Sequence, residues 1–138
     1  MSEVSRGAPE HGPDGARRGL RRLLHRWTSS RAELEAEELQ EDAEEAGATP
    51  IASCGERQRA AVCGTVRTVT LRPRSGVPCL EADLYDGSDM VTLVWLGRRR
   101  IGGIEPGRML LAEGLVSVQN GRKVMFNPRY QLRPVGGA

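Results

Sequence analysis

The chain has 138 residues and a net charge of +2, which is enough for one ordinary domain and a tail. No apolar run approaches the ~20 residues that cross a bilayer. The first residues contain neither the basic nor the apolar region of a secretory signal. Cys54, Cys63 and Cys79 form no C-x-x-C pair, so we expect reduced thiols in a cytoplasmic protein without a disulfide or metal.

The small net charge hides an asymmetry between the two parts of the chain. Residues 1–50 carry 7 Arg and 11 Asp and Glu, whereas residues 51–138 carry 13 Lys and Arg and 7 Asp and Glu. A basic domain behind an acidic leader suggests a polyanionic partner for the domain. Nearly all the cations are Arg, in the leader as well, and codon bias in a GC-rich genome explains this use of Arg better than nucleic-acid binding does.

The leader divides into three segments by composition. Residues 1–16 are rich in Gly, Pro, Ser and charge and are predicted to be disordered. Residues 17–47 are predicted to be helical: a basic amphipathic helix first, then an acidic helix that begins with a capping box at Ser30–Glu33. The acidic helix has few large apolar residues, so we expect it to be solvated and partly frayed. Residues 48–56 are predicted to form a linker.

Residues 57–134 predict an all-β domain, followed by a short tail at 135–138. Alternating apolar and polar residues, separated by turn residues, indicate strands at 59–71, 79–85, 90–96, 108–119 and 122–132. Five strands with a long connection between the third and the fourth are typical of the OB-fold, a five-stranded Greek-key barrel. Such barrels commonly bind single strands or oligosaccharides on the face of strands 2 and 3.

Two changes of parity and two turns can be predicted within this domain. The inward face changes parity near Arg67-Thr68, which predicts a β-bulge, and again at Gly114, which predicts a bulge or a corner. Asn120-Gly121 is typical of a type I′ hairpin turn. A further turn is expected at Asp86–Asp89, because the Asp86 side chain can accept hydrogen bonds from nearby backbone N–H groups. The other predicted inward residues are Leu80, Leu84, Val91, Leu93, Val124 and Phe126.

Three stretches of the domain carry a family resemblance: Val91–Gly97, Gly107-Arg108 and Asn127–Tyr130. They resemble the OB-fold wedge domain of RecG-type helicases and the broader tRNA/helicase-type OB family. As a whole, the chain is similar to small actinobacterial OB-fold proteins that bind nucleic acid. The resemblance implies a binding module, and no G-x-x-x-x-G-K-[ST] loop accompanies it that would indicate an ATP-driven motor.

The candidate binding residues are cations and aromatic side chains, because single strands need contacts to phosphates and surfaces for base stacking. Two cationic pairs flank the expected binding face, one in the loop at 72–78 and one beside the turn at 120–121. The run at 98–100 either ends the third strand beside this face or caps the barrel. The cationic candidates are Arg72, Arg74, Arg98, Arg99, Arg100, Arg122, Lys123 and Arg129.

The aromatic candidates are Tyr85, Trp95 and Tyr130. Tyr85 has the opposite parity to Leu80 and Leu84, which favours exposure. Trp95 shares its parity with Val91 and Leu93, so it is either buried or emerges at the strand end to stack on a base. Tyr130 follows a proline and either packs as a lid or stacks.

Catalysis finds little support in the sequence. The two histidines, His11 and His25, both lie in the leader, so no His accompanies a Ser or Cys inside the domain. We therefore expect no enzyme activity, cofactor or metal. Two function classes remain: a module that binds single-stranded DNA or RNA with weak sequence preference, and a protein-interaction adaptor that uses the barrel and the leader helices. If the arginines converge on one face, nucleic acid is favoured, whereas a neutral apolar face favours the adaptor.

Overall fold

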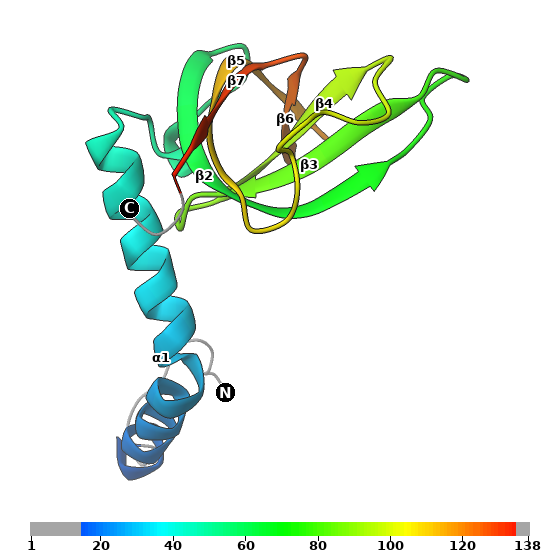
Figure 1. The fold of residues 1–138 in the computed structure, drawn as a ribbon. Coiled ribbons are helices and arrows are strands. Elements are labelled where there is room, and N and C mark those ends of the chain that lie inside the picture. Colours follow the sequence, from blue (N-terminus) through cyan, green and yellow to red (C-terminus); the bar gives the residue numbers. More distant parts are fainter. Residues whose placement is uncertain (1–14, 135–138) are drawn as a thin grey trace. The chain divides into compact units, whose positions relative to one another are not determined.

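The computed structural model describes residues 15–134, with side chains from residue 30 onward. It contains one long helix, a short 3₁₀ turn and six strands (Figure 1). The chain divides after Leu34 into two units, and the second unit, from Glu35, holds the end of the helix and all six strands. The predictions for residues 1–14 and 135–138 lie outside the described residues. The elements are α1 (Gly15–Glu45), η2 (Ile51–Ser53), β2 (Arg59–Leu71), β3 (Cys79–Tyr85), β4 (Met90–Leu96), β5 (Met109–Gln119), β6 (Arg122–Phe126) and β7 (Arg129–Arg133).

All six strands form one sheet, in which five are hydrogen-bonded in a ring. The order is β2-β3-β4-β6-β5-β7, and β2 also pairs with β5, which closes the ring. Every pairing is antiparallel except that of β4 with β6. The predicted last strand is broken into β6 and β7 at Asn127-Pro128, where Asn127 has a φ of 51° and the proline lacks an N–H.

Strand β2 is long because it pairs with two neighbouring strands, β5 and β3. Residues 59–65 pair with β5, and residues 65–71 pair with β3. The register with β3 shifts between Val66 and Thr68, which confirms the predicted bulge. The bulge lets Val66 and Val69 both reach the core despite their odd spacing.

The second predicted change of parity, at Gly114, is wrong. Leu110, Ala112 and Val116 all point into the core, so the inward positions of β5 continue through Gly114 without a slip. Met109 and Leu111 lie on the opposite face and pack in a separate cluster with α1. This part of β5 is covered on both faces, so apolar residues occupy successive positions and their pattern does not identify the inward side.

The core inside the ring draws on segments beyond the strands. Ile101 and Ile104 come from the connection between β4 and β5, and Ile51 comes from the segment predicted as a linker. The predicted inward positions in β6 are wrong. Met125 is fully buried in this core, whereas Val124 and Phe126 lie on the outer face with Cys79 and Val94. The other predicted inward residues, Leu80, Leu84, Val91 and Leu93, belong to the core.

Helix α1 differs from both predictions made for it. It continues through Ser30 to Glu45, so no second helix begins at the predicted capping box. Its last turns are not wholly solvated, because Leu39 and Ala43 are buried against Cys63 and Met109. These two apolar side chains, one turn apart, form the apolar part of the contact between this polar helix segment and the sheet.

Both predicted tight turns are confirmed. Asn120 and Gly121 have φ angles of 53° and 77°, as a type I′ turn requires. Asp86 accepts hydrogen bonds from the backbone N–H groups of Ser88 (2.9 Å) and Asp89 (3.1 Å). These turns place the start of β4 beside the start of β6, where Val91 pairs with Lys123.

Candidate functional site

The candidate site is the outer face of β3, β4 and β6, meaning the side chains of these strands that point away from the core. The loop at 72–78 bounds it at one end, and the turn at 120–121 bounds it at the other. At its centre is a small apolar patch: Cys79, Val94 and Val124 are buried there, and Phe126 packs against them half-buried. We call this the Phe126 patch.

Arg72 and Arg74 both lie beside Glu81, which is the acidic residue nearest the Phe126 patch in β3. The Nη2 of Arg74 is 3.2 Å from Oε2 of Glu81, and the Nε of Arg72 is 3.8 Å from Oε1. The guanidinium carbon of Arg74 also lies 5.5 Å from the centroid of the Phe126 ring. Arg74 is therefore fixed over the patch, whereas Arg72 is only loosely held.

Asp83 organises the other half of the outer face. Its carboxylate accepts hydrogen bonds from the hydroxyls of Thr68 (2.9 Å) and Thr92 (2.8 Å), which lie on the strands to either side. The Nη2 of Arg122 donates to the Thr92 hydroxyl at 3.2 Å and lies 3.9 Å from Asp83. A polar ladder thus crosses four strands, from β2 to β6, and ends at an arginine that is mostly exposed.

An open hollow of about 190 Å³ lies next to this arginine, and it is lined by Asp89, Met90, Thr92, Gly121, Arg122 and Lys123. Lys123 donates to the carbonyl of Ile51 at 2.7 Å and lies 3.1 Å from Asp89. Burial raises the pKa of Asp89, but hydrogen bonds from Met90 N–H and Lys123 outweigh it and lower that pKa overall. Both contacts of the Lys123 ammonium are thus to other residues of the protein, and Arg122, whose side chain is 67% exposed, is the more accessible cation here.

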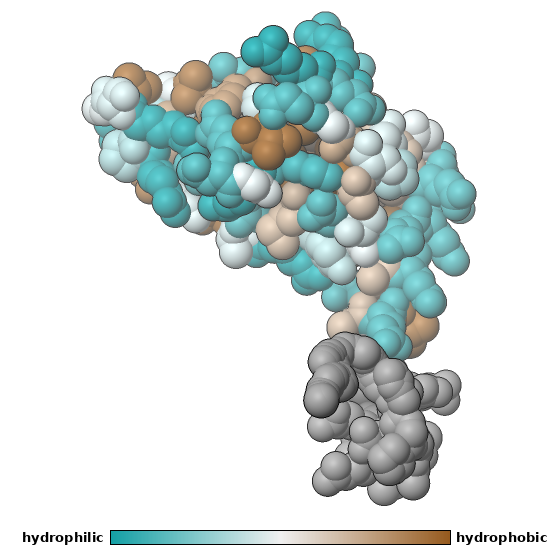
Figure 2. All heavy atoms as spheres, turned by 180° about the vertical axis from the view of Figure 1, so that it is seen from behind, coloured by the Kyte–Doolittle hydropathy of each residue, from teal (hydrophilic) through white to brown (hydrophobic). Residues whose placement is uncertain are grey.

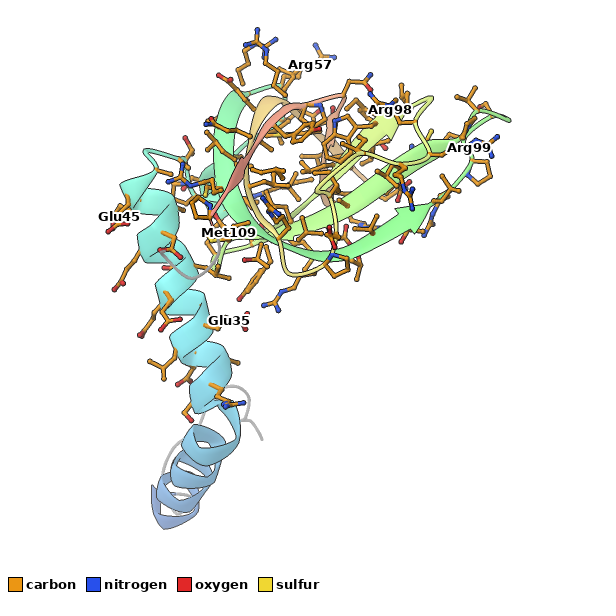
Figure 3. The ribbon with its side chains drawn as sticks, in the orientation of Figure 1. Glu35, Glu45, Arg57, Arg98, Arg99 and Met109 are labelled. Atoms are coloured by element: carbon orange, nitrogen blue, oxygen red, sulfur yellow. The ribbon has the colours of Figure 1, made fainter. Side chains whose placement is uncertain are left out.

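The arginines at 98–100 lie at the same end of the sheet as the loop at 72–78. They follow β4, and the N–H of Gly97 donates to the carbonyl of Pro78 at 2.7 Å, which ties the two segments together. All three are exposed, and Figure 3 shows Arg98 and Arg99 at that end, away from Glu45. Ile101 and Ile104, which follow these arginines, are buried in the core, whereas the three arginine side chains point to solvent.

Arg129 begins β7 just after the break between β6 and β7, where it pairs with Glu113 of β5. The side-chain carbonyl of Asn127 accepts a hydrogen bond from the N–H of Leu96 at 3.0 Å, so this break lies beside the end of β4. Arg129 is exposed. Within residues 30–134, no carboxylate lies within ion-pair distance of Arg129 or of the three arginines at 98–100.

Trp95 is a core residue. Its side chain is buried, its Nε1 donates to the carbonyl of Pro128 at 3.0 Å, and the edge of Tyr130 packs on it at a centroid distance of 5.7 Å. A ring in this position has no free face for a base. Tyr130 packs against the indole and is still 39% exposed, so it acts as a lid and keeps an accessible surface.

Tyr85 lies on the outer side of β3, as its parity predicted, but helix α1 covers it. It packs in the cluster of Leu39 and Ala43, and the guanidinium carbon of Arg67 sits 4.6 Å from its ring centroid. Arg67 is held in turn by Glu35 of the helix at 3.3 Å. Tyr85 is therefore not available as a stacking surface while the helix is in place.

Three residues of this face are not among the sequence-predicted site residues: Phe126, Glu81 and Asp83. Phe126 was assigned to the core because β6 was read with the wrong inward parity, and the flanking Met125 was the signal against that reading. Glu81 and Asp83 alternate with the inward Leu80, Ala82 and Leu84, so their position on the outer face could have been read directly. The residues that bond to Glu81 and Asp83 come from other strands and loops, so these contacts could not be predicted from the sequence.

The three cysteines are free and buried. Burial is the main cause that raises the pKa of the Cys63 thiol, so this side chain is protonated and unreactive at neutral pH. Among the described side chains, no three His, Cys, Asp or Glu groups are placed to share a metal ion. Within the described residues, no helix is long and apolar enough to span a membrane. Comparison with protein-family models and with curated proteins finds no match for this chain.

Proposed function

We propose that the protein is a non-catalytic OB-type module that binds single-stranded DNA or RNA along the outer face of β3, β4 and β6. The observation that carries the proposal is the placement of cations around the Phe126 patch. Arg72 and the run at 98–100 come from two segments that are joined by the Gly97–Pro78 hydrogen bond at one end, and Arg122 lies at the other. Phosphates along a strand would contact both ends while bases meet the patch between them.

The strand pairing supports the OB-type assignment. One long, bulged strand pairs with two neighbours, and the ring includes a parallel pairing between the third and the fifth strands in chain order. The long connection between β4 and β5 fills one end of the ring with Ile101 and Ile104. Three buried free cysteines fit a reducing, cytoplasmic setting.

Binding is expected to be weak. Glu81, Asp83 and Asp89 share the outer face with the cations and neutralise part of their charge. Arg98, Arg99 and Arg100 have no such partner among the described residues, so they are the best candidates for phosphate contacts. Two of the three predicted aromatic platforms, Trp95 and Tyr85, are buried or covered, which leaves few stacking surfaces.

The test replaces Arg98, Arg99 and Arg100 together with Ala and measures binding to a labelled single-stranded oligonucleotide by fluorescence anisotropy. The variant should bind all sequences more weakly, and the slope of log affinity against log salt should flatten by about 0.7 for each phosphate that the protein no longer neutralises. The matched control replaces the same three residues with Lys, which keeps the charge and should keep most of the slope. Unchanged binding by the Ala variant would contradict the proposal.

A protein-interaction adaptor is the second candidate, and one observation favours it. Leu71, Val77 and Leu96 are 53%, 45% and 44% exposed around the loop at 72–78. The arginines surround these residues, so the surface is not neutral. On the face that Figure 2 shows, hydrophobic residues form small separate spots within a mostly hydrophilic surface, which does not resemble the broad apolar area of a permanent interface.

A further inference from the structure

The turn at the end of the β2–β3 loop holds Arg74 in a fixed position. The N–H groups of Arg74 and Val77 each donate to the other's carbonyl, at 2.8 and 2.9 Å. The two residues between them, Ser75 and Gly76, have φ angles of 51° and 79°. This is a tight two-residue turn rather than a loose loop, so the backbone that carries Arg74 is restrained.

The Arg74 side chain is restrained as well. Its Nε and Nη2 both lie within hydrogen-bond distance of Oε2 of Glu81, at 3.3 and 3.2 Å. The Glu81 side chain is only 12% exposed, whereas that of Arg74 is 39% exposed. Glu81 lies at one edge of the guanidinium and the Phe126 ring lies beneath it. The side of the guanidinium away from Phe126 is therefore the part of Arg74 that a ligand can reach.

A planar guanidinium that rests on an aromatic ring is a stacking surface for a nucleobase. Because Trp95 is buried and Tyr85 is covered, we infer that Arg74, held over the Phe126 ring by Glu81, is the base-stacking platform of the outer face. The inference rests on the proposed function and deepens it. It names unpaired bases, rather than phosphates alone, as what the site recognises. A base in a duplex is stacked between its neighbours and cannot reach this surface.

Arg72 provides a matched comparison within the same site. It lies beside the same Glu81 carboxylate, at 3.8 Å, but no aromatic ring among the described residues lies beneath it, and its side chain is 62% exposed. Its expected contribution is charge. Replacement of either arginine by Lys keeps the charge and removes the plane, so only the Arg74 change should affect base recognition.

The experiment compares two labelled oligomers of equal length and charge, oligothymidine and its fully abasic analogue, by fluorescence anisotropy at low salt. The full chain should bind oligothymidine more tightly than the abasic oligomer. Arg74→Lys should lower affinity for oligothymidine roughly 5- to 100-fold, the usual range for one lost stack, and leave affinity for the abasic oligomer unchanged. Arg72→Lys should change neither, and thermal melting should show both variants folded.

A second variant, Phe126→Leu, keeps an apolar side chain over Cys79, Val94 and Val124 but removes the ring under Arg74. It should reduce the preference for oligothymidine in the same direction. Equal affinity of the parent for both oligomers, or equal losses for both in Arg74→Lys, would overturn the inference and leave the proposed function standing. Failure of the parent to bind either oligomer at low salt would overturn both.

Discussion

Asp86 is the one fully buried acidic side chain among the described residues, and its bonding explains why it is tolerated. It is 1% exposed. One carboxylate oxygen accepts from the N–H of Ile51 at 2.8 Å. The other accepts from the N–H groups of Ser88 and Asp89 and from the Ser88 hydroxyl at 2.7 Å. Asp86 therefore joins the turn between β3 and β4 to the 3₁₀ turn that brings Ile51 into the core.

We predict that Asp86→Asn destabilises the domain by about 2–4 kcal/mol, because an amide nitrogen would face backbone donors and the charge-assisted bonds would be lost. Urea unfolding followed by circular dichroism measures the change. Asp89→Asn, three residues away, is the control: Asp89 is 45% exposed and pairs with Lys123 at the surface, so its replacement should cost no more than about 1 kcal/mol. An equal loss of unfolding free energy in the two variants would show that the buried hydrogen bonds of Asp86 stabilise the domain no more than the exposed pair of Asp89 does.

The control variant also has a predicted pH dependence. The pKa of Asp89 is lower in the folded protein than its ordinary value, because the Met90 and Lys123 hydrogen bonds outweigh its burial. The ionised carboxylate thus stabilises the fold above its unfolded pKa of about 4, and this contribution is lost as the pH falls through the lower, folded pKa. The parent should exceed Asp89→Asn in stability at pH 7, and the gap should close near pH 2. A gap that persists at pH 2 would contradict this assignment.

At the residue scale, the sequence predicted the face of the strand on which a side chain lies better than it predicted which residues contact that side chain. The parity of β3 placed Tyr85 outside the core correctly, but nothing in the sequence indicated that α1 would cover it. Trp95 was assigned either to the core or to a strand-end platform, and the choice depends on Pro128 and Tyr130, which are distant in sequence. Phe126 was assigned to the wrong face because β6 is short and apolar at three successive positions.

At the element scale, the contact of α1 with the turn between β3 and β4 depends on Gly87. The carbonyl of Ala36 lies so close to Gly87 that a Cβ there would collide with it, and Gln40 donates to the Gly87 carbonyl at 2.8 Å. Gly87 has a φ of 91°, whereas Gly121, in the other predicted turn, has a φ of 77° and open space where a Cβ would lie. Both glycines have a positive φ, which strains any other residue, but only Gly87 lies in contact with the helix.

We therefore predict that Gly87→Ala costs more than Gly121→Ala. Each should lose roughly 1–2 kcal/mol from the left-handed backbone conformation, and Gly87→Ala should also displace the helix. Hydrogen exchange would report this directly, with faster exchange of the amides at 35–45 in Gly87→Ala and unchanged exchange there in Gly121→Ala. If these amides exchange alike in the two variants, the helix does not depend on this close approach.

The apolar side of the same contact gives an independent prediction. Leu39 is 6% exposed and Leu34 is 56% exposed on the same helix. Leu39→Ala should destabilise by about 2 kcal/mol, at the low end for a buried leucine because its cluster is small. Leu34→Ala should change the stability by no more than a few tenths of a kcal/mol, because the Leu34 side chain is exposed and Ala is at least as good a helix former as Leu. Thermal melting of both variants measures the difference, and a similar small loss in both would mean that the helix segment is not docked in solution.

How far the elements could be predicted depended on whether one face was exposed. The first bulge could be read because β2 alternates, and the glycine turn was clear because both positions need positive φ. The parity of β5 could not be read, because the docked helix covers its other face. The sparse apolar residues of α1 predicted a solvated helix, and the pairing of Leu39 and Ala43 with Cys63 and Met109 depends on tertiary contacts that local patterns do not contain.

At the scale of the whole molecule, the placement of cations in the sheet-containing unit is the observation on which the nucleic-acid proposal rests. Arg72 and the run at 98–100 come from two segments that are hydrogen-bonded at one end of the outer face, as the nucleic-acid proposal requires. Arg122 lies at the opposite end, and carboxylates within the face reduce the net charge. This arrangement favours weak binding with little sequence preference over a high-affinity single-strand coat.

The most direct test titrates the full chain with labelled single-stranded DNA, single-stranded RNA and duplex DNA of equal length across a series of salt concentrations. We expect tighter binding to the single strands than to the duplex. We also expect a slope of log affinity against log salt between roughly −2 and −3.5, as three to five phosphate contacts would give. Binding that is absent at low salt, indifferent to salt or stronger for the duplex would contradict it.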